Sequence, residues 1–249
     1  MLDKLPKKLG NEPLVDAIFE IRFSSQMPAS VLLPGFLYNQ LEGNKQLNML
    51  PVAQLPKEVR DADPNLRYAP ISRIDWSDFF VSIGEYSVAI SCKYPYCGWE
   101  NFKKAIINLL SALNESSIIN RVERYSLKYI DLIPDLDAEQ KVAMIELDLS
   151  IANHKLKNEQ FQLRIEIPDD SFLHVVQIAS TANVVVHNGK KMEGLLIDTD
   201  SIAPFNVPMQ SLISDSLSIK LDEIHDANKQ MFFNCLKPQA VAKLKPVYE

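Results

Sequence analysis

Two acidic residues, Asp198 and Asp200, are separated by one residue in the sequence Leu-Ile-Asp-Thr-Asp. In a β-strand, residues two apart point to the same face, so both carboxylates could bind Mg²⁺ or Ca²⁺ together. The alternative is a strand end at which two solvated acids leave the core. We favour this alternative, so no metal site is predicted, and a metal-dependent enzyme using Asp198 and Asp200 is the weakest functional hypothesis.

A second group of candidate residues combines charge with an aromatic ring. Arg124 and Lys128 alternate with apolar residues and would share the polar face of one strand. Glu20 and Arg22 would share the polar face of another strand. Together with Trp99 these residues form a candidate binding surface. If the two strands pair, the simpler explanation is cross-strand charge pairing, worth about 0.2–1 kcal/mol for each pair.

Catalytic loops and clusters are missing from the sequence. The chain has seven glycines in 249 residues, and no two are closer than five residues, which excludes a dinucleotide-binding or nucleophile-elbow loop; the P-loop sequence does not occur either. The four histidines are scattered and show no metalloprotease spacing. We therefore predict no catalytic residue and no cofactor, and we lean against an enzyme.

The net charge and the cysteine content indicate which kinds of partner and which cellular compartment to expect. The formal net charge of −6 makes nucleic acid an unlikely partner. Three cysteines, Cys92, Cys97 and Cys235, do not form a secreted disulfide framework and are interpreted as buried thiols. No signal peptide or membrane span is evident, so we predict a cytoplasmic protein that does not bind membranes.

Hydrophobic periodicity predicts the elements that must position these residues. Alternation predicts strands over 15–23 and 121–133, and helical spacing of apolar residues predicts amphipathic helices over 98–114 and 210–236. A weaker helix is predicted over 28–41, and 42–70, with four prolines, is expected to be a long irregular excursion. Further strands are predicted at 71–76, 79–83, 86–92, 144–151, 161–167, 172–179, 183–187 and 192–198.

The order of these elements predicts an α+β fold. Runs of strands with few helices favour mainly antiparallel pairing over a doubly wound parallel sheet. Pro134–Asp137 has the composition of a turn and is the candidate boundary. We therefore predict two halves, 1–134 and 135–249, each a mainly antiparallel sheet followed by a long amphipathic helix.

Several strings resemble those of a known family. They are NEPLVDAIFEIRF, YPYCGWENFKKAI, VERYSLKYIDLI, GLLIDTDSI and LDEIHDANKQMFF, which together span nearly the whole chain. The chain resembles a sporadically distributed family of uncharacterised bacterial proteins of about this length. Lys128 stands where the family often has arginine. The resemblance implies no established activity, but its patchy distribution is similar to that of genes in defence-related or mobile loci.

Three functional hypotheses follow. The first is a non-enzymatic binding or regulatory protein that acts through protein partners in a bacterial defence or toxin–antitoxin type locus, with the 42–70 excursion as a partner-facing segment. The alternative is a small-molecule-binding α+β module with a pocket between helix and sheet. The weaker alternative is the metal-dependent enzyme described above. A homo-oligomer is possible under each hypothesis.

Overall fold

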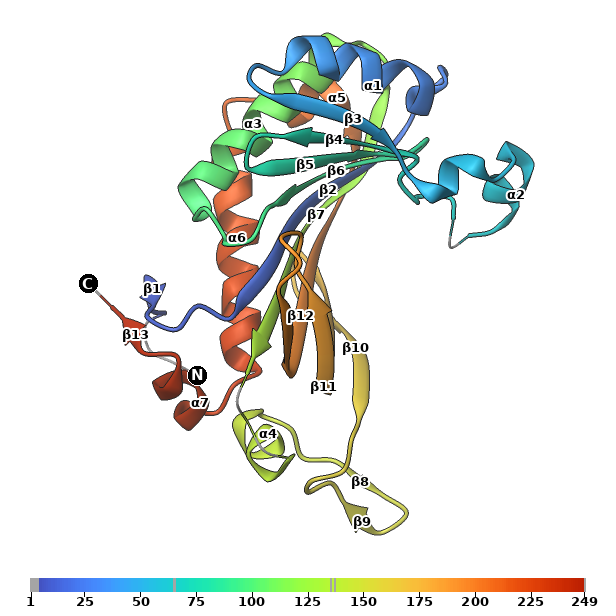
Figure 1. Cartoon of the computed structure of the whole chain (residues 1–249). Helices are drawn as coiled ribbons and strands as arrows, with labels where there is room; N and C mark the ends of the chain where they lie inside the picture. Colours follow the sequence, from blue (N-terminus) through green and yellow to red (C-terminus); the bar gives the residue numbers. More distant parts are fainter. Residues whose placement is uncertain (1–4, 65, 135, 137, 249) are drawn as a thin grey trace. The chain divides into compact units, whose positions relative to one another are not determined.

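The computed structural model describes residues 5–64, 66–134, 136 and 138–248 (Figure 1). Its helices are α1 (Ala29–Gln40), the 3-10 turn η1 (Pro51–Gln54), α2 (Lys57–Ala62), α3 (Trp99–Glu115), α4 (Ala138–Met144), α5 (Met209–Leu212), α6 (Leu217–Asn234) and α7 (Pro238–Lys243). Its strands are β1 (Lys8–Leu9), β2 (Leu14–Ser24), β3 (Lys45–Met49), β4 (Ser72–Trp76), β5 (Phe79–Ile83), β6 (Ser87–Cys92), β7 (Arg121–Ile133), β8 (Ser150–Ile151), β9 (His154–Lys155), β10 (Gln162–Pro168), β11 (Leu173–Val185), β12 (Lys191–Pro208) and β13 (Pro246–Val247). Within these residues, no helix is both long enough and apolar enough to cross a membrane.

The strands of the main sheet follow the order β10-β11-β12-β7-β2-β6-β5-β4-β3. The pairs β10–β11, β2–β6, β5–β6, β4–β5 and β3–β4 are antiparallel. Strand β3 therefore lies at one edge of the sheet and β10 at the other. The α+β class predicted from runs of strands with few helices is confirmed.

The chain divides into two compact units, each assembled from separate segments. Unit 1 comprises residues 1–16, 128–201 and 225–249, and unit 2 comprises residues 17–127 and 202–224. Strands β2, β7 and β12 and helix α6 contribute residues to both units. The predicted division into halves 1–134 and 135–249 is not confirmed, because each unit takes segments from both halves.

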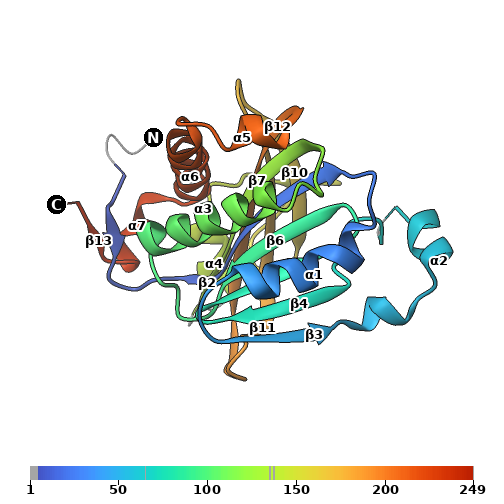
Figure 2. The same cartoon turned by 90° about the horizontal axis from the view of Figure 1, so that it is seen from above.

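In unit 2, helices α1 and α3 cover one face of the sheet (Figure 2). The strand register places Phe19, Ile90 and Val81 side by side on this face, and each is at most 2% exposed. Helix α3 has the amphipathic pattern expected of a helix packed on a sheet, and Phe102 on its inner side stacks on Phe79 at 6.2 Å between ring centroids. Ile106, on the apolar side of this helix, is fully buried, as the helical spacing of apolar residues over 98–114 leads us to expect.

In unit 1, the core forms between strands β7, β11 and β12 and the C-terminal residues. The buried apolar residues of this cluster include Ile133, Met144, Ile145, Val176, Ile178, Leu195, Ile197, Phe232, Phe233, Leu236, Val241 and Leu244. Strand β12 contributes Leu195 and Ile197, which are two residues apart and therefore share one face of the strand.

The strand predicted over 144–151 is not formed as such. Residues 138–144 are instead helix α4, in agreement with the high helix propensity of Ala, Glu, Gln, Lys and Met. Ile145 is fully buried and forms an isolated antiparallel bridge to Leu236, whereas only Ser150–Ile151 belong to a strand, β8. Alternating apolar residues do place Ile145 in the core, but the segment has no neighbouring strand of matching length.

The helix predicted over 210–236 is broken. Helix α5 ends at Leu212, and α6 begins at Leu217 after Ser214, Asp215 and Ser216. These side chains compete with the helical backbone for hydrogen bonds, and the Ser214 and Ser216 hydroxyls lie 2.8 Å apart. Ser and Asp side chains thus end one helix and precede the next.

The excursion predicted over 42–70 contains regular structure. It holds the edge strand β3, the turn η1 and helix α2, whose bounds fall between its prolines. The register pairs Leu47 with Ile74 of β4. The alternation of apolar residues in Leu47-Asn48-Met49 is only three residues long, which is too short to predict a strand from the sequence.

Candidate functional site

The predicted charged surface exists in part, as an ion-paired cluster of unit 2. Glu20 and Arg22 lie on β2, on the face opposite Phe19, and Arg124 lies on β7. Arg22 Nε contacts Glu20 Oε1 at 2.8 Å, and Arg124 Nη2 contacts the same oxygen at 3.3 Å. The Arg22 guanidinium also stacks over the Tyr68 ring at 4.0 Å. One carboxylate therefore holds both cations, which is the cross-strand charge pairing considered from the sequence.

The structure does not bring Trp99 to this cluster. Trp99 begins α3 on the helix-covered side of the unit 2 sheet, and its ring packs edge-on against Phe102 at 6.5 Å. Its indole N–H donates to Asp222 of α6 at 2.8 Å, and Lys103 Nζ contacts the same carboxylate at 2.6 Å. Trp99 thus connects α3 with α6 inside unit 2.

Lys128 belongs to unit 1, where it is paired with Asp198. Lys128 Nζ lies 2.7 Å from Asp198 Oδ2, and Gln177 Nε2 donates to the same oxygen at 3.3 Å. Asp198 is only 7% exposed. Burial raises the pKa of Asp198, and the hydrogen bond and charge of Lys128 act in the opposite direction. The lysine therefore compensates a carboxylate that the sheet has removed from water.

Asp198 and Asp200 lie two residues apart on β12, as expected. In the part of the chain that the structure describes, no group of three His, Cys, Asp or Glu side chains is placed to hold a metal ion. Because Lys128 already occupies the Asp198 carboxylate, the geometry favours a buried ion pair over a metal ligand at this position.

A buried polar network in unit 1 has the residue types of a hydrolase triad. His174 Nδ1 lies 2.8 Å from Ser201 Oγ, and His174 Nε2 lies 3.7 Å from Asp169 Oδ2. Asn228 Nδ2 donates both to Ser201 Oγ at 3.0 Å and to the Thr199 carbonyl at 2.8 Å. Ser201 has no exposed surface, and His174 is 1% exposed. A nucleophile must meet its substrate, so this network stabilises β12 and α6 instead.

Burial also determines the protonation of His174. Desolvation lowers the pKa of His174, and the charge of Asp169 opposes this effect. A neutral imidazole can both accept and donate hydrogen bonds, which suits its place beside the Ser201 hydroxyl.

A buried carboxyl group, Asp131, was not singled out by the sequence analysis. It follows Tyr129 on the inner face of β7 and is 4% exposed. Burial raises the pKa of Asp131 well above its ordinary value, and the charges of Glu12 and Asp198 raise it further. The alternation of Tyr125, Tyr129 and Asp131 along one strand face was the signal that could have found it.

A hollow in unit 1 has a volume of about 550 Å³. It is lined by helix α4, the segments around β9 and Lys237, and its lining includes Glu139, Glu146, Asp148, Lys155 and Lys157. Charges of both signs line it, and it lies beside short loops. It does not have the position of the pocket between a long helix and a sheet that the small-molecule hypothesis expects.

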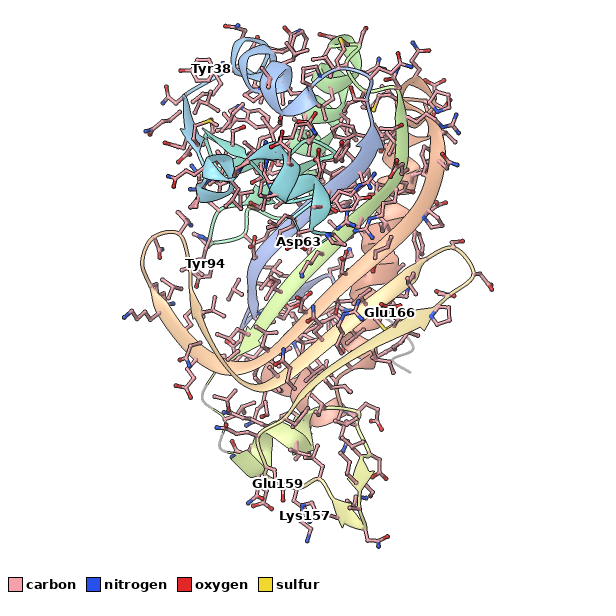
Figure 3. The ribbon with its side chains drawn as sticks, turned by 90° about the vertical axis from the view of Figure 1, so that its right-hand side faces the viewer. Tyr38, Asp63, Tyr94, Lys157, Glu159 and Glu166 are labelled. Atoms are coloured by element: carbon pink, nitrogen blue, oxygen red, sulfur yellow. The ribbon has the colours of Figure 1, made fainter. Side chains whose placement is uncertain are left out.

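Helix α1 and the edge strand β3 of unit 2 carry several exposed apolar residues. We call the exposed residues Val31, Tyr38, Leu47 and Met49 the α1–β3 edge; they are 70%, 40%, 40% and 66% exposed, respectively. The Tyr38 hydroxyl donates to the Lys45 carbonyl at 3.3 Å, which connects α1 to β3 (Tyr38 is labelled in Figure 3). Scattered exposed apolar residues are ordinary, but a group beside a free strand edge is typical of an interaction site.

The backbone of β3 is oriented for further pairing. Leu50 N donates to Ile71 O at 2.8 Å, and Ser77 N donates to Asn44 O at 3.2 Å. In an antiparallel pair, residues alternate between those bonded to the neighbour and those whose N–H and C=O point away from it. Residues 44, 46, 48 and 50 therefore face β4, and the backbone groups of Leu47 and Met49 point to the open edge.

Comparison with known proteins adds no relative: no protein-family model matches the chain, and no curated protein matches it. The resemblance to the sporadically distributed bacterial family therefore stays a prediction.

Proposed function

We propose that the chain is a non-enzymatic binding protein that recruits a protein partner at the α1–β3 edge. The partner contributes an extended segment that adds to the sheet as an antiparallel or parallel neighbour of β3. The observation that carries the proposal is the coincidence, at Leu47 and Met49, of an outward-facing backbone with an exposed apolar side chain. Strand addition uses these two features together.

The two features supply affinity and selectivity in different ways. The N–H and C=O groups of Leu47 and Met49 offer main-chain hydrogen bonds, which bind any extended segment. The apolar surface of Val31, Tyr38, Leu47 and Met49 lies on the helix-covered side of the sheet, so it contacts only alternate residues of the added strand. The preferred segment therefore alternates apolar and polar side chains.

Natural edge strands are normally blocked by charge, proline or a covering element. Lys45 is the one cation of β3, and its ammonium group is drawn over the Tyr38 ring, 5.3 Å from the centroid. The rest of the strand, Gln46 to Met49, carries neither charge nor proline. This composition does not block the edge, and it therefore favours pairing of β3 with a strand of a partner protein.

The charged residues singled out from the sequence pair with one another within each unit, so the proposal does not place the partner on them. The assignment of the partner to a defence or toxin–antitoxin type locus rests on the family resemblance alone. It directs the search for a natural partner to proteins encoded next to this chain.

A proline scan of β3 tests the proposal. Leu47→Pro removes an N–H that points to the open edge and should leave the β3–β4 hydrogen bonds intact, whereas Asn48→Pro removes an N–H that faces β4. We expect Leu47→Pro to retain the melting temperature to within a few degrees and Asn48→Pro to lower it more. Ile165→Arg, at the exposed residue of the opposite edge strand β10, is the matched surface control.

The probe is a displayed library of random short peptides selected on the wild-type protein. Peptides that bind the wild type and Ile165→Arg but not Leu47→Pro, and that slow hydrogen exchange at the amides of Leu47 and Met49, would support the proposal. Selected peptides that bind Leu47→Pro equally would overturn it. Self-association of the wild type that Leu47→Pro abolishes would also overturn it, since the occupant would then be a second copy of this chain.

A further inference from the structure

Two thiols of unit 2 lie in contact between β6 and α3. Cys92 is the last residue of β6, and Cys97 lies two residues before the first residue of α3. Their Sγ atoms are 3.2 Å apart, and the backbone N–H of Cys97 points to Cys92 Sγ at 3.4 Å. A disulfide has a sulfur–sulfur distance of about 2.05 Å, so the two sulfurs need to approach by little more than 1 Å.

The two cysteines differ in accessibility. Cys92 is 5% exposed within the sheet, whereas Cys97 is partly exposed in the segment 93–98, which has neither helix nor strand. Tyr94, labelled in Figure 3, belongs to the same segment. Gly98 has φ = 87° and ends it. A segment without regular hydrogen bonds can adjust by the distance that bond formation requires.

We propose that Cys92 and Cys97 form a reversible intramolecular disulfide when the protein meets a small-molecule disulfide such as oxidised glutathione. The hydrogen bond with Cys92 and burial raise the pKa of the Cys97 thiol, so its reactive thiolate forms mainly at alkaline pH. This accessible thiolate attacks one glutathione sulfur, forming a mixed disulfide and releasing glutathione thiolate. The Cys92 thiolate then attacks Cys97 Sγ and releases the second glutathione. Two protein thiols are oxidised and one glutathione disulfide is reduced to two glutathiones, whose thiolates take up the two protons that the protein thiols release.

The position of the pair connects its oxidation to the start of α3. The Tyr96 and Trp99 rings flank Cys97 in sequence, and both pack edge-on against Phe102, at 6.1 and 6.5 Å. The Trp99 indole also donates to Asp222. A covalent link between the end of β6 and the residue before Gly98 therefore changes the surroundings of Trp99, and indole fluorescence should report it.

The experiment uses the full chain with Cys235→Ser as the parent, so that only the pair remains. The parent is incubated with an excess of oxidised glutathione, quenched with acid and analysed by intact mass. We expect the loss of two hydrogens, the disappearance of both titratable thiols, a change in Trp99 fluorescence, and full reversal by dithiothreitol. Trp99→Phe, which leaves Trp76 as the remaining tryptophan, identifies the source of the fluorescence change.

Single-cysteine variants separate the two steps. Cys92→Ser in the same parent should accumulate a stable mixed disulfide at Cys97, because the resolving thiol is missing. Cys97→Ser should react much more slowly, because Cys92 is buried. A parent protein that keeps both thiols, or that stops at a mixed disulfide on Cys97 as Cys92→Ser does, would overturn the inference. So would a disulfide that joins two chains.

Discussion

Replacing Asp131 by Asn should stabilise the protein increasingly as the pH rises. Asp131 is 4% exposed on the inner face of β7, and burial raises its pKa well above the value of an ordinary aspartate, with Glu12 and Asp198 adding to the effect. The native state therefore holds the proton to a higher pH than the unfolded state does. Asn has nearly the shape of the neutral acid but does not ionise.

The sign and size of the effect follow from proton linkage. Below the unfolded-state pKa of about 3.9, Asp131 is protonated in both states and has no pH-dependent effect. Above this pH only the unfolded state releases the proton, so the wild-type protein loses about 1.4 kcal/mol of unfolding free energy per pH unit. The loss stops at the native pKa. The advantage of Asp131→Asn should grow at the same rate over this window and then become constant.

Urea unfolding of both proteins at half-unit pH intervals from pH 4 to pH 8 measures this difference. Glu12, whose pKa burial also raises, titrates in both proteins and largely cancels in the comparison. A difference in unfolding free energy that does not change with pH would refute the assignment of Asp131 as a neutral buried acid. A variant that becomes less stable than the wild type as the pH rises would refute it too.

Two further predictions concern stability. Ile106→Ala should lower the unfolding free energy by about 2–5 kcal/mol, because Ile106 is fully buried on the inner face of α3; a loss below 1 kcal/mol in chemical denaturation would contradict this core assignment. Lys128→Ala should cost about 1–3 kcal/mol at pH 7, since it leaves the buried Asp198 without its cation, and adding Asp198→Asn should restore much of the loss. Arg124→Ala is the matched control and should cost less than about 1 kcal/mol, because Arg22 still pairs with Glu20.

Much of the fold could be predicted because its strands have one buried face. The alternation over 15–23 and 121–133 locates β2 and β7 to within about a residue at each end, and helical spacing locates α3 equally well. In each of these elements, one side contacts a core and the other does not. The sequence pattern then predicts both the type of element and which side chains face the core.

The remaining differences between the predicted and the observed elements arise where contacts with other segments, and not the local sequence pattern, determine the structure. Strand β12 extends to Pro208, beyond the predicted end at residue 198, because its polar residues Thr199 and Ser201 are buried in a hydrogen-bonded network. Such residues are typical of a strand end, and their partners come from α6 and β11. The two units could not be predicted either, since strand alternation specifies a buried face but not which segments share a core.

For the candidate site too, the sequence does not specify which residues the fold brings together. Arg124 and Glu20 were selected by residue type, and the fold pairs them with each other; Asp198 was selected as a possible ligand, and the fold gives it Lys128. Leu47 and Met49 were not selected, because their types are those of core residues. Their importance depends on which residues of β3 form hydrogen bonds with β4. Because the even-numbered residues do so, the backbone groups of Leu47 and Met49 point to the edge of the sheet, and their side chains are exposed as well. Lys128 compensates the charge of the buried Asp198, whereas no partner strand covers the outer side of β3 in the part of the chain that the structure describes; this difference is why the proposed function is placed at β3.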